Sequence, residues 1–220
     1  MEKSMFEEAI DFIKSRKKMN LAIILANIVV FIVMEMMGDT ADVQFMAEHG
    51  AMLIPASWET GEIYRLFTAM FLHFGIEHIF YNMLMLIFIG DMLETYVGSL
   101  RYLLVYLGGG LIGNVASAVI GTERIMRAAG GTMYWTVAAG ASGAVFAAVG
   151  GLVVIALRNR GRNIGLDSRR LVLMAALTLF GGIRESGVDH VAHIAGFLGG
   201  ALVCAVVTLR LFPASGRSGS

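Results

Sequence analysis

The chain has 220 residues, of which 57% are hydrophobic and 15% are charged, and its formal net charge is zero. A soluble domain usually has about 25% charged residues, so this composition and a mean hydropathy of +0.72 exclude an ordinary soluble domain. The balanced charge gives no support for a nucleic-acid partner. The 27 glycines indicate helices that pack closely in lipid through small residues.

Six segments are candidates for membrane-spanning helices. A span needs about 20 mostly apolar residues, and the fifth candidate is shorter than the others. The candidates are residues 21–37, 67–93, 100–120, 141–157, 171–183 and 191–211. The sequence therefore predicts an all-α membrane protein with a six-helix bundle over residues 20–212. An N-terminal segment, 1–19, precedes the bundle, and we expect the tail 213–220 to be disordered.

Lysine and arginine residues predict the orientation, because short cytoplasmic loops carry an excess of both. Four of them lie within residues 14–18, before the first span, and five lie within 158–170, between the fourth and fifth spans. Residues 39–62 carry five acids and no Lys or Arg, which favours the outside. We therefore expect both termini in the cytoplasm. We also expect a multi-pass protein of a prokaryotic plasma (inner) membrane.

The first outer connection, residues 38–65, is too long for a turn. It contains Pro55, Trp58 and Tyr64 among apolar residues, so we expect part of it to lie in the membrane interface as an amphipathic segment. Tyr64 and Arg65, at the entry to the second span, are typical of an interfacial anchor and are expected to brace this loop.

Two polar side chains in the outer half of the second span are four residues apart. A polar group within a span is costly in lipid and needs a partner or a function. His78 and Asn82 share one face of a helix, where two donors could stabilise an oxyanion. For one such pair taken alone, hydrogen bonding between helices is an equally good explanation.

A serine stands among small residues at the predicted start of the fourth span. Gly140 and Gly143 flank Ala141 and Ser142, which leaves the serine hydroxyl and its backbone N–H open to an approaching backbone. A helix that begins there aims free N–H groups at the same spot. For this motif alone, a helix-capping serine is the better explanation.

The sixth span carries a histidine next to a glycine seam. Gly196 and Gly200 allow a close approach to another helix, and His193 lies about one turn before them. A lone histidine is more often a satisfied polar residue than a base. Glu94, with glycines four residues before and after it, is interpreted as a structural buried carboxylate that accepts hydrogen bonds from a packed neighbour.

The predicted topology brings these separate signals together. The fourth and sixth spans both begin outside, so Ser142 and His193 are expected at similar shallow depths. His78 and Asn82 fall in the outer half of the second span. Three helices thus bring a nucleophile, a base and two hydrogen-bond donors to the same depth in the membrane. This is the arrangement that acyl transfer requires.

At residues 20–210 the chain resembles the rhomboid intramembrane proteases. The motifs that carry the resemblance are Tyr64-Arg65, where the family usually has Trp-Arg, His78-xxx-Asn82, Gly90-xxx-Glu94-xxx-Gly98, Gly140-Ala141-Ser142-Gly143 and Ala192-His193-xx-Gly196-xxx-Gly200. The resemblance implies a Ser142–His193 dyad and an oxyanion hole formed by His78, Asn82 and the Ser142 backbone N–H. It also implies that Phe146 packs against the catalytic imidazole and that residues 171–189 form a gate.

The function implied by this resemblance is that of a serine endopeptidase that cleaves transmembrane helices of substrate membrane proteins near the outer face. Its partners would be those helices and the lipid bilayer, and no metal or organic cofactor is implied. Asp189 is four residues before His193 and could share its face. We do not expect it to complete a triad, because the family works with two residues.

Two other functions compete with this one. The first is a catalytically silent rhomboid-like protein that binds membrane helices; such proteins lack the serine or the histidine, and this chain has both. The second is a small transporter that uses His78, Asn82 and His193 as a polar pathway. Transporters commonly have inverted repeats and helices that are broken deeper in the membrane, and neither feature is evident in the sequence.

Overall fold

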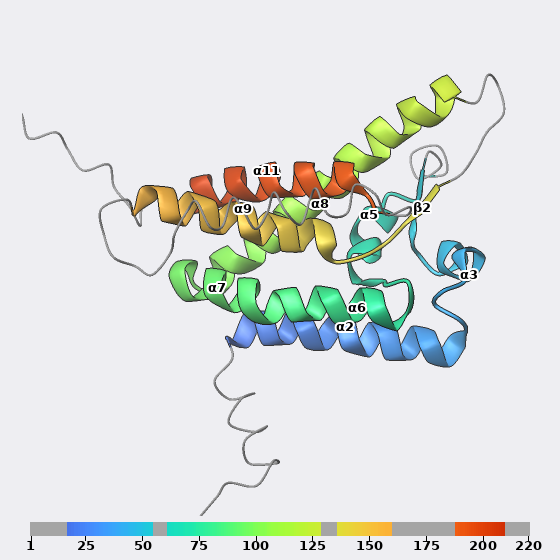
Figure 1. Ribbon diagram of the computed structural model, residues 1–220, viewed down its shortest axis with the longest axis horizontal. Helices are drawn as coiled ribbons and strands as arrows, with labels where there is room; N and C mark the ends of the chain where they lie inside the picture. The colour runs from blue at the N-terminus through green and yellow to red at the C-terminus, as the bar shows by residue number, and fades with distance from the viewer. Residues whose placement is uncertain (1–16, 55–60, 129–135, 160–187, 210–220) are drawn as a thin grey trace, which may run out of the picture.

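The computed structural model describes residues 17–54, 61–128, 136–159 and 188–209. Long apolar helices dominate this part of the chain (Figure 1). The elements are α2 (Lys18–Met37), α3 (Val43–Glu48), β1 (Met52–Ile54), α5 (Arg65–Thr68), η1 (Ala69–Phe71), α6 (Gly75–Met85), η2 (Leu86–Gly90), α7 (Asp91–Val97), α8 (Ser99–Ala128), β2 (Thr136–Ala138), α9 (Ser142–Arg158) and α11 (His190–Val207).

Four helical segments in the described ranges are long and apolar enough to cross a membrane. They are α2, the continuous segment Gly75–Val97 formed by α6, η2 and α7, the stretch Ser99–Thr122 of α8, and α11. The shorter α9 is also apolar. The prediction of an integral membrane protein is therefore confirmed. The predicted fifth span, the N-terminal segment up to residue 16 and the tail lie outside the described residues, so the six-span count stays a prediction.

The second span begins later than the sequence predicted. Residues 67–71 form the end of α5 and the 3-10 turn η1, and Leu72 is extended, with φ −92° and ψ 145°. The spanning helix starts only at Gly75, whose φ of +70° favours glycine. A hydropathy pattern does not detect this break, because apolar residues stand on both sides of it.

The centre of the bundle is α9, most of whose residues are buried. Glycines bring its backbone against that of α11: a Cβ on Gly200 would lie 2.2 Å from the Ala147 carbonyl oxygen, and one on Gly196 would lie 2.3 Å from that of Gly143. Figure 1 shows α9 and α11 side by side, with α8 crossing them. A Cβ on Gly113 of α8 would likewise lie 2.6 Å from the Ala192 carbonyl oxygen. Such contacts suit lipid, where close packing stabilises helix pairs.

The first helix is attached to the bundle by a buried carboxylate. Glu94 is 4% exposed, and it accepts hydrogen bonds from the backbone N–H groups of Met19 (3.2 Å) and Asn20 (2.7 Å) and from the Ser99 hydroxyl (2.6 Å). The N–H groups of a first helical turn have no partner within the helix, and a negative charge there is favourable. Glu94 therefore caps α2 from another helix.

Replacing Glu94 by alanine is expected to lower the free energy of unfolding by about 2 kcal/mol or more, because each buried donor left unpaired costs about 1–3 kcal/mol. A thermal melt in detergent, monitored by circular dichroism, measures the effect. The matched control is Glu77→Ala, which removes an exposed glutamate of α6. Equal melting temperatures for the two variants would contradict the capping role.

A small sheet that the all-α prediction did not include joins the connection between α2 and α5 to the segment before α9. Strand β1 pairs antiparallel with β2, with Leu53 opposite Val137. Beside this sheet, Arg65 is buried and donates to the backbone oxygens of Ala47 (2.7 Å) and Ala51 (2.9 Å). The end of the bundle that holds α3, β1 and β2 is called the sheet end below. Residues 55–60, which include Pro55 and Trp58 of the predicted interfacial segment, lie outside the described residues.

Candidate active site

Ser142 is the first residue of α9, and β2 leads to it through a short linker. In this linker Gly140 has φ +137°, which favours glycine, and its N–H donates to the Ala69 carbonyl at 2.8 Å. A Cβ on Gly140 would lie 2.7 Å from the His78 ring. A glycine is therefore needed at position 140 for two reasons: the backbone conformation, and the imidazole that leaves no room for a Cβ.

The Ser142 hydroxyl is in hydrogen-bond contact with a histidine from another helix. His193, in the first turn of α11, places its Nε2 atom 2.7 Å from Ser142 Oγ. The Phe146 ring stacks on the His193 ring, with centroids 4.6 Å apart and planes at 28°. Phe146 lies one turn after Ser142 on α9, so the same helix supplies the hydroxyl and the aromatic ring that packs against His193. A serine paired with an oriented imidazole is the geometry of an activated nucleophile.

Two further polar side chains reach the same region from α6. His78 Nδ1 accepts a 3.4 Å hydrogen bond from the Phe74 backbone N–H. A neutral imidazole whose Nδ1 accepts carries its proton on Nε2, and His78 Nε2 is the ring nitrogen beside Gly140. Asn82 is buried, and its Nδ2 donates to the carbonyl of His78 at 2.9 Å. Its amide is thus partly engaged by its own helix.

A third histidine of this region, His73, carried no role in the sequence interpretation. His73 is 1% exposed, and its Nε2 accepts from the backbone N–H of Ala141 at 3.4 Å. Its ring meets that of His78 edge to face, with centroids 5.2 Å apart. His73 is five residues before His78, which is not a helical spacing for one face, so the helix break before Gly75 is what brings them together.

Both carboxylate oxygens of Asp189 accept hydrogen bonds from groups other than the imidazole. Asp189 is the N-cap of α11: Oδ1 accepts from the Ala192 backbone N–H at 2.9 Å, and Oδ2 accepts from the Ser117 hydroxyl on α8. The expectation that Asp189 completes no triad stays a prediction. Within the described ranges, no three His, Cys, Asp or Glu side chains are gathered so that they could hold a metal ion.

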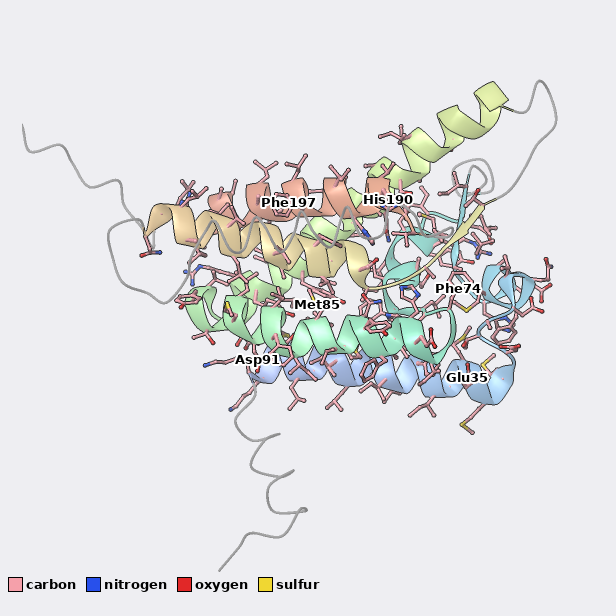
Figure 2. All side chains as sticks on the ribbon, viewed as in Figure 1. Glu35, Phe74, Met85, Asp91, His190 and Phe197 are labelled. Carbon is pink, nitrogen blue, oxygen red and sulfur yellow. The ribbon has the colours of Figure 1, made fainter. Side chains whose placement is uncertain are left out.

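All of these groups lie toward the sheet end of the bundle. In Figure 2, Phe74 just before α6 and His190 at the start of α11 lie toward that end, whereas Asp91 lies at the opposite end. Glu94, predicted to be structural, is in α7 together with Asp91 and thus lies toward the opposite end. Gly143, Gly196 and Gly200 line the contact between the two helices that carry Ser142 and His193.

Comparison with known proteins finds relatives along most of the chain. A model of the Rhomboid domain matches residues 60–210, more than half of the chain. "Rhomboid protease GluP" of Bacillus subtilis (strain 168) is 29% identical over 214 residues, 96% of this chain and 39% of the relative. "RHOMBOID-like protein 4" of Arabidopsis thaliana is 36% identical over 151 residues, 68% of this chain and 35% of the relative.

A third relative is "Rhomboid protease AarA" of Providencia stuartii, which is 32% identical over 157 residues, 66% of this chain and 56% of the relative. The chain thus spans about two fifths of the length of GluP and somewhat more than half that of AarA. The resemblance seen in the sequence motifs is confirmed, and the chain belongs to the rhomboid family of membrane proteins.

Proposed function

We propose that the protein is an intramembrane serine endopeptidase that cleaves transmembrane helices of substrate membrane proteins near the outer face of the membrane. The observation that carries this proposal is the 2.7 Å contact between His193 Nε2 and Ser142 Oγ. A family whose relatives are named proteases, and a site that holds both residues, favour an enzyme over a catalytically silent helix-binding protein.

The reaction is nucleophilic acyl transfer. His193 Nε2 takes the proton of the Ser142 hydroxyl as Oγ attacks the scissile carbonyl carbon. The negative charge on the carbonyl oxygen is stabilised by the Ser142 backbone N–H together with His78 and Asn82. His193 then gives its proton to the leaving amine, and water hydrolyses the acyl-enzyme.

The surroundings of the dyad support these steps. Stacking on Phe146 holds the imidazole in one orientation, and the ring face favours the imidazolium formed during the reaction. His78 presents a proton on Nε2. Asn82 gives one of its two amide protons to the His78 carbonyl, and the other is available to donate to the oxyanion.

The length of α9 sets the depth of the site. A helix of 17 residues is about 25 Å long, whereas the hydrocarbon core is about 30 Å thick. With Arg158 at the cytoplasmic interface, as the positive-inside rule favours, Ser142 lies about 5 Å below the outer edge. Water can reach this depth. A substrate helix must unwind there, because a helical peptide bond is shielded and internally hydrogen-bonded.

The proposal includes six spans, with residues 1–19 and 213–220 in the cytoplasm of a prokaryotic cell. The test is to reconstitute the purified protein in lipid vesicles with single-span model substrates and to identify the products by mass spectrometry. The expected result is cleavage within the outer part of the substrate helix. Stable association without any product would instead identify a helix-binding protein.

A further inference from the structure

The histidine of the dyad lies in the part of α11 that frays most easily. The first N–H groups of a helix lack partners within it, and His193 belongs to this first turn. Asp189 is the N-cap of this turn: its carboxylate accepts from the otherwise unpaired Ala192 N–H at 2.9 Å, and its backbone carbonyl accepts the first helical bond, from His193 N–H, at 3.1 Å. The backbone of His193 is thus bonded directly to Asp189.

The same carboxylate joins two helices. Its Oδ2 accepts from the hydroxyl of Ser117, a residue of α8 that is 4% exposed. Gly113, one turn earlier on α8, packs against the carbonyl of Ala192. The hydrogen bond from Ser117 to Asp189 is called the Asp189–Ser117 link. It holds the first turn of α11 against α8, next to the close contact between the backbones of Gly113 and Ala192.

The opposite end of α11 is also tied to its neighbours. Arg101 of α8 donates from Nε to the Val207 carbonyl at 3.1 Å, and Arg158 of α9 donates from Nη2 to the Ala205 carbonyl at 2.8 Å. These bonds satisfy carbonyls that lack helical partners at a C-terminus. The Asp189–Ser117 link is their counterpart at the end that carries His193, so α11 is held at both ends.

We propose that Asp189 and Ser117 are positioning residues that hold His193 within proton-transfer distance of Ser142. This inference rests on the proposed protease function. Proton transfer needs a heavy-atom distance of about 2.6–3.2 Å, and a misplacement of about 1 Å can cost roughly a hundredfold in rate. Asp189 acts through the backbone and the neighbouring helix and does not touch the imidazole or the substrate.

The test compares kcat and KM for four variants. Asp189→Ala, which removes the cap and the link, is expected to lower kcat about tenfold or more with little change in KM. Ser117→Ala, which removes the link alone, is expected to lower kcat less. The kcat of the double variant is expected to be no lower than that of Asp189→Ala, because both changes break the same contact. Asp189→Asn keeps an oxygen for Ala192 and an amide for Ser117, so its rate should stay within about tenfold of wild type, or 1.4 kcal/mol.

The matched control is Thr122→Ala, because Thr122 is also a hydroxyl on α8 but donates to Ala118 of its own helix. A wild-type kcat in both Ser117→Ala and Asp189→Ala would overturn the proposal. A loss of about a thousandfold in Asp189→Asn would also overturn it, since that loss would identify the acid of a triad.

Hydrogen–deuterium exchange separates this proposal from the protease function. The first turn of α11 is expected to exchange faster in Ser117→Ala than in wild type or Thr122→Ala, whether or not substrate is cleaved. Unchanged exchange would overturn the positioning role, and because Ser117→Ala removes one hydroxyl, it provides the test even if Asp189→Ala does not fold. A wild-type protein that cleaves nothing but shows this exchange response would refute only the protease function.

Discussion

Replacing Ser142 or His193 by alanine is expected to abolish proteolysis while leaving the protein folded and in the membrane. Ser142 supplies the attacking oxygen, and His193, whose Nε2 lies 2.7 Å from that oxygen, receives its proton. Alanine can do neither, so we expect a loss of about four orders of magnitude or more in turnover. The measurement is cleavage of a single-span substrate in vesicles by each purified variant.

The controls for this experiment match the residue types that are replaced. Thr95→Ala removes an exposed hydroxyl that donates to Asp91 of its own helix, and His49→Ala removes an exposed histidine that contacts the Phe45 carbonyl. Both should cleave at the wild-type rate. Equal thermal melts for all variants show that folding is intact. Near wild-type turnover in either Ser142→Ala or His193→Ala would refute the dyad.

The second large effect is expected at the oxyanion. Asn82→Ala and His78→Ala should each lower turnover about 10²–10³-fold, the usual result of losing one such donor, or about 2.7–4 kcal/mol. Activity is not eliminated, because the Ser142 backbone N–H still donates. The oxyanion forms only during the reaction, so the loss of Asn82 should act mainly on kcat and less on KM.

A double variant and a neighbouring control complete this test. Asn82→Ala combined with His78→Ala should be slower than either single variant. Glu77→Ala, which changes an exposed residue of α6 next to His78, should leave the rate unchanged. If the two single variants and the double variant all keep the wild-type rate, neither side chain belongs to the oxyanion hole.

Features governed by local patterns could be predicted from the sequence. The apolar segments that became α2, α8 and α11 are recognisable because a membrane span needs a long apolar run. The start of α9 at Ser142 follows from the small residues around it. These local signals, in a fixed order along the chain, were enough to identify the family.

Features that depend on distant partners could not be predicted. Strands β1 and β2 are three residues each and are about 80 residues apart in the sequence, so neither carries a detectable pattern. His73 joins the site only because the chain breaks before Gly75. Helical spacing placed Asp189 on the face of His193, but it gave no indication that Ser117 of another helix takes its carboxylate.

The central claim, that Ser142 is a nucleophile activated by His193, is tested most directly by a fluorophosphonate probe, which reacts covalently with activated serines. The purified protein is labelled in lipid vesicles, and the adduct is located by peptide mass spectrometry. We expect the adduct on Ser142 in wild type, none in Ser142→Ala, and little or none in His193→Ala. Labelling that persists in Ser142→Ala, or that maps to a different residue in wild type, would contradict the claim.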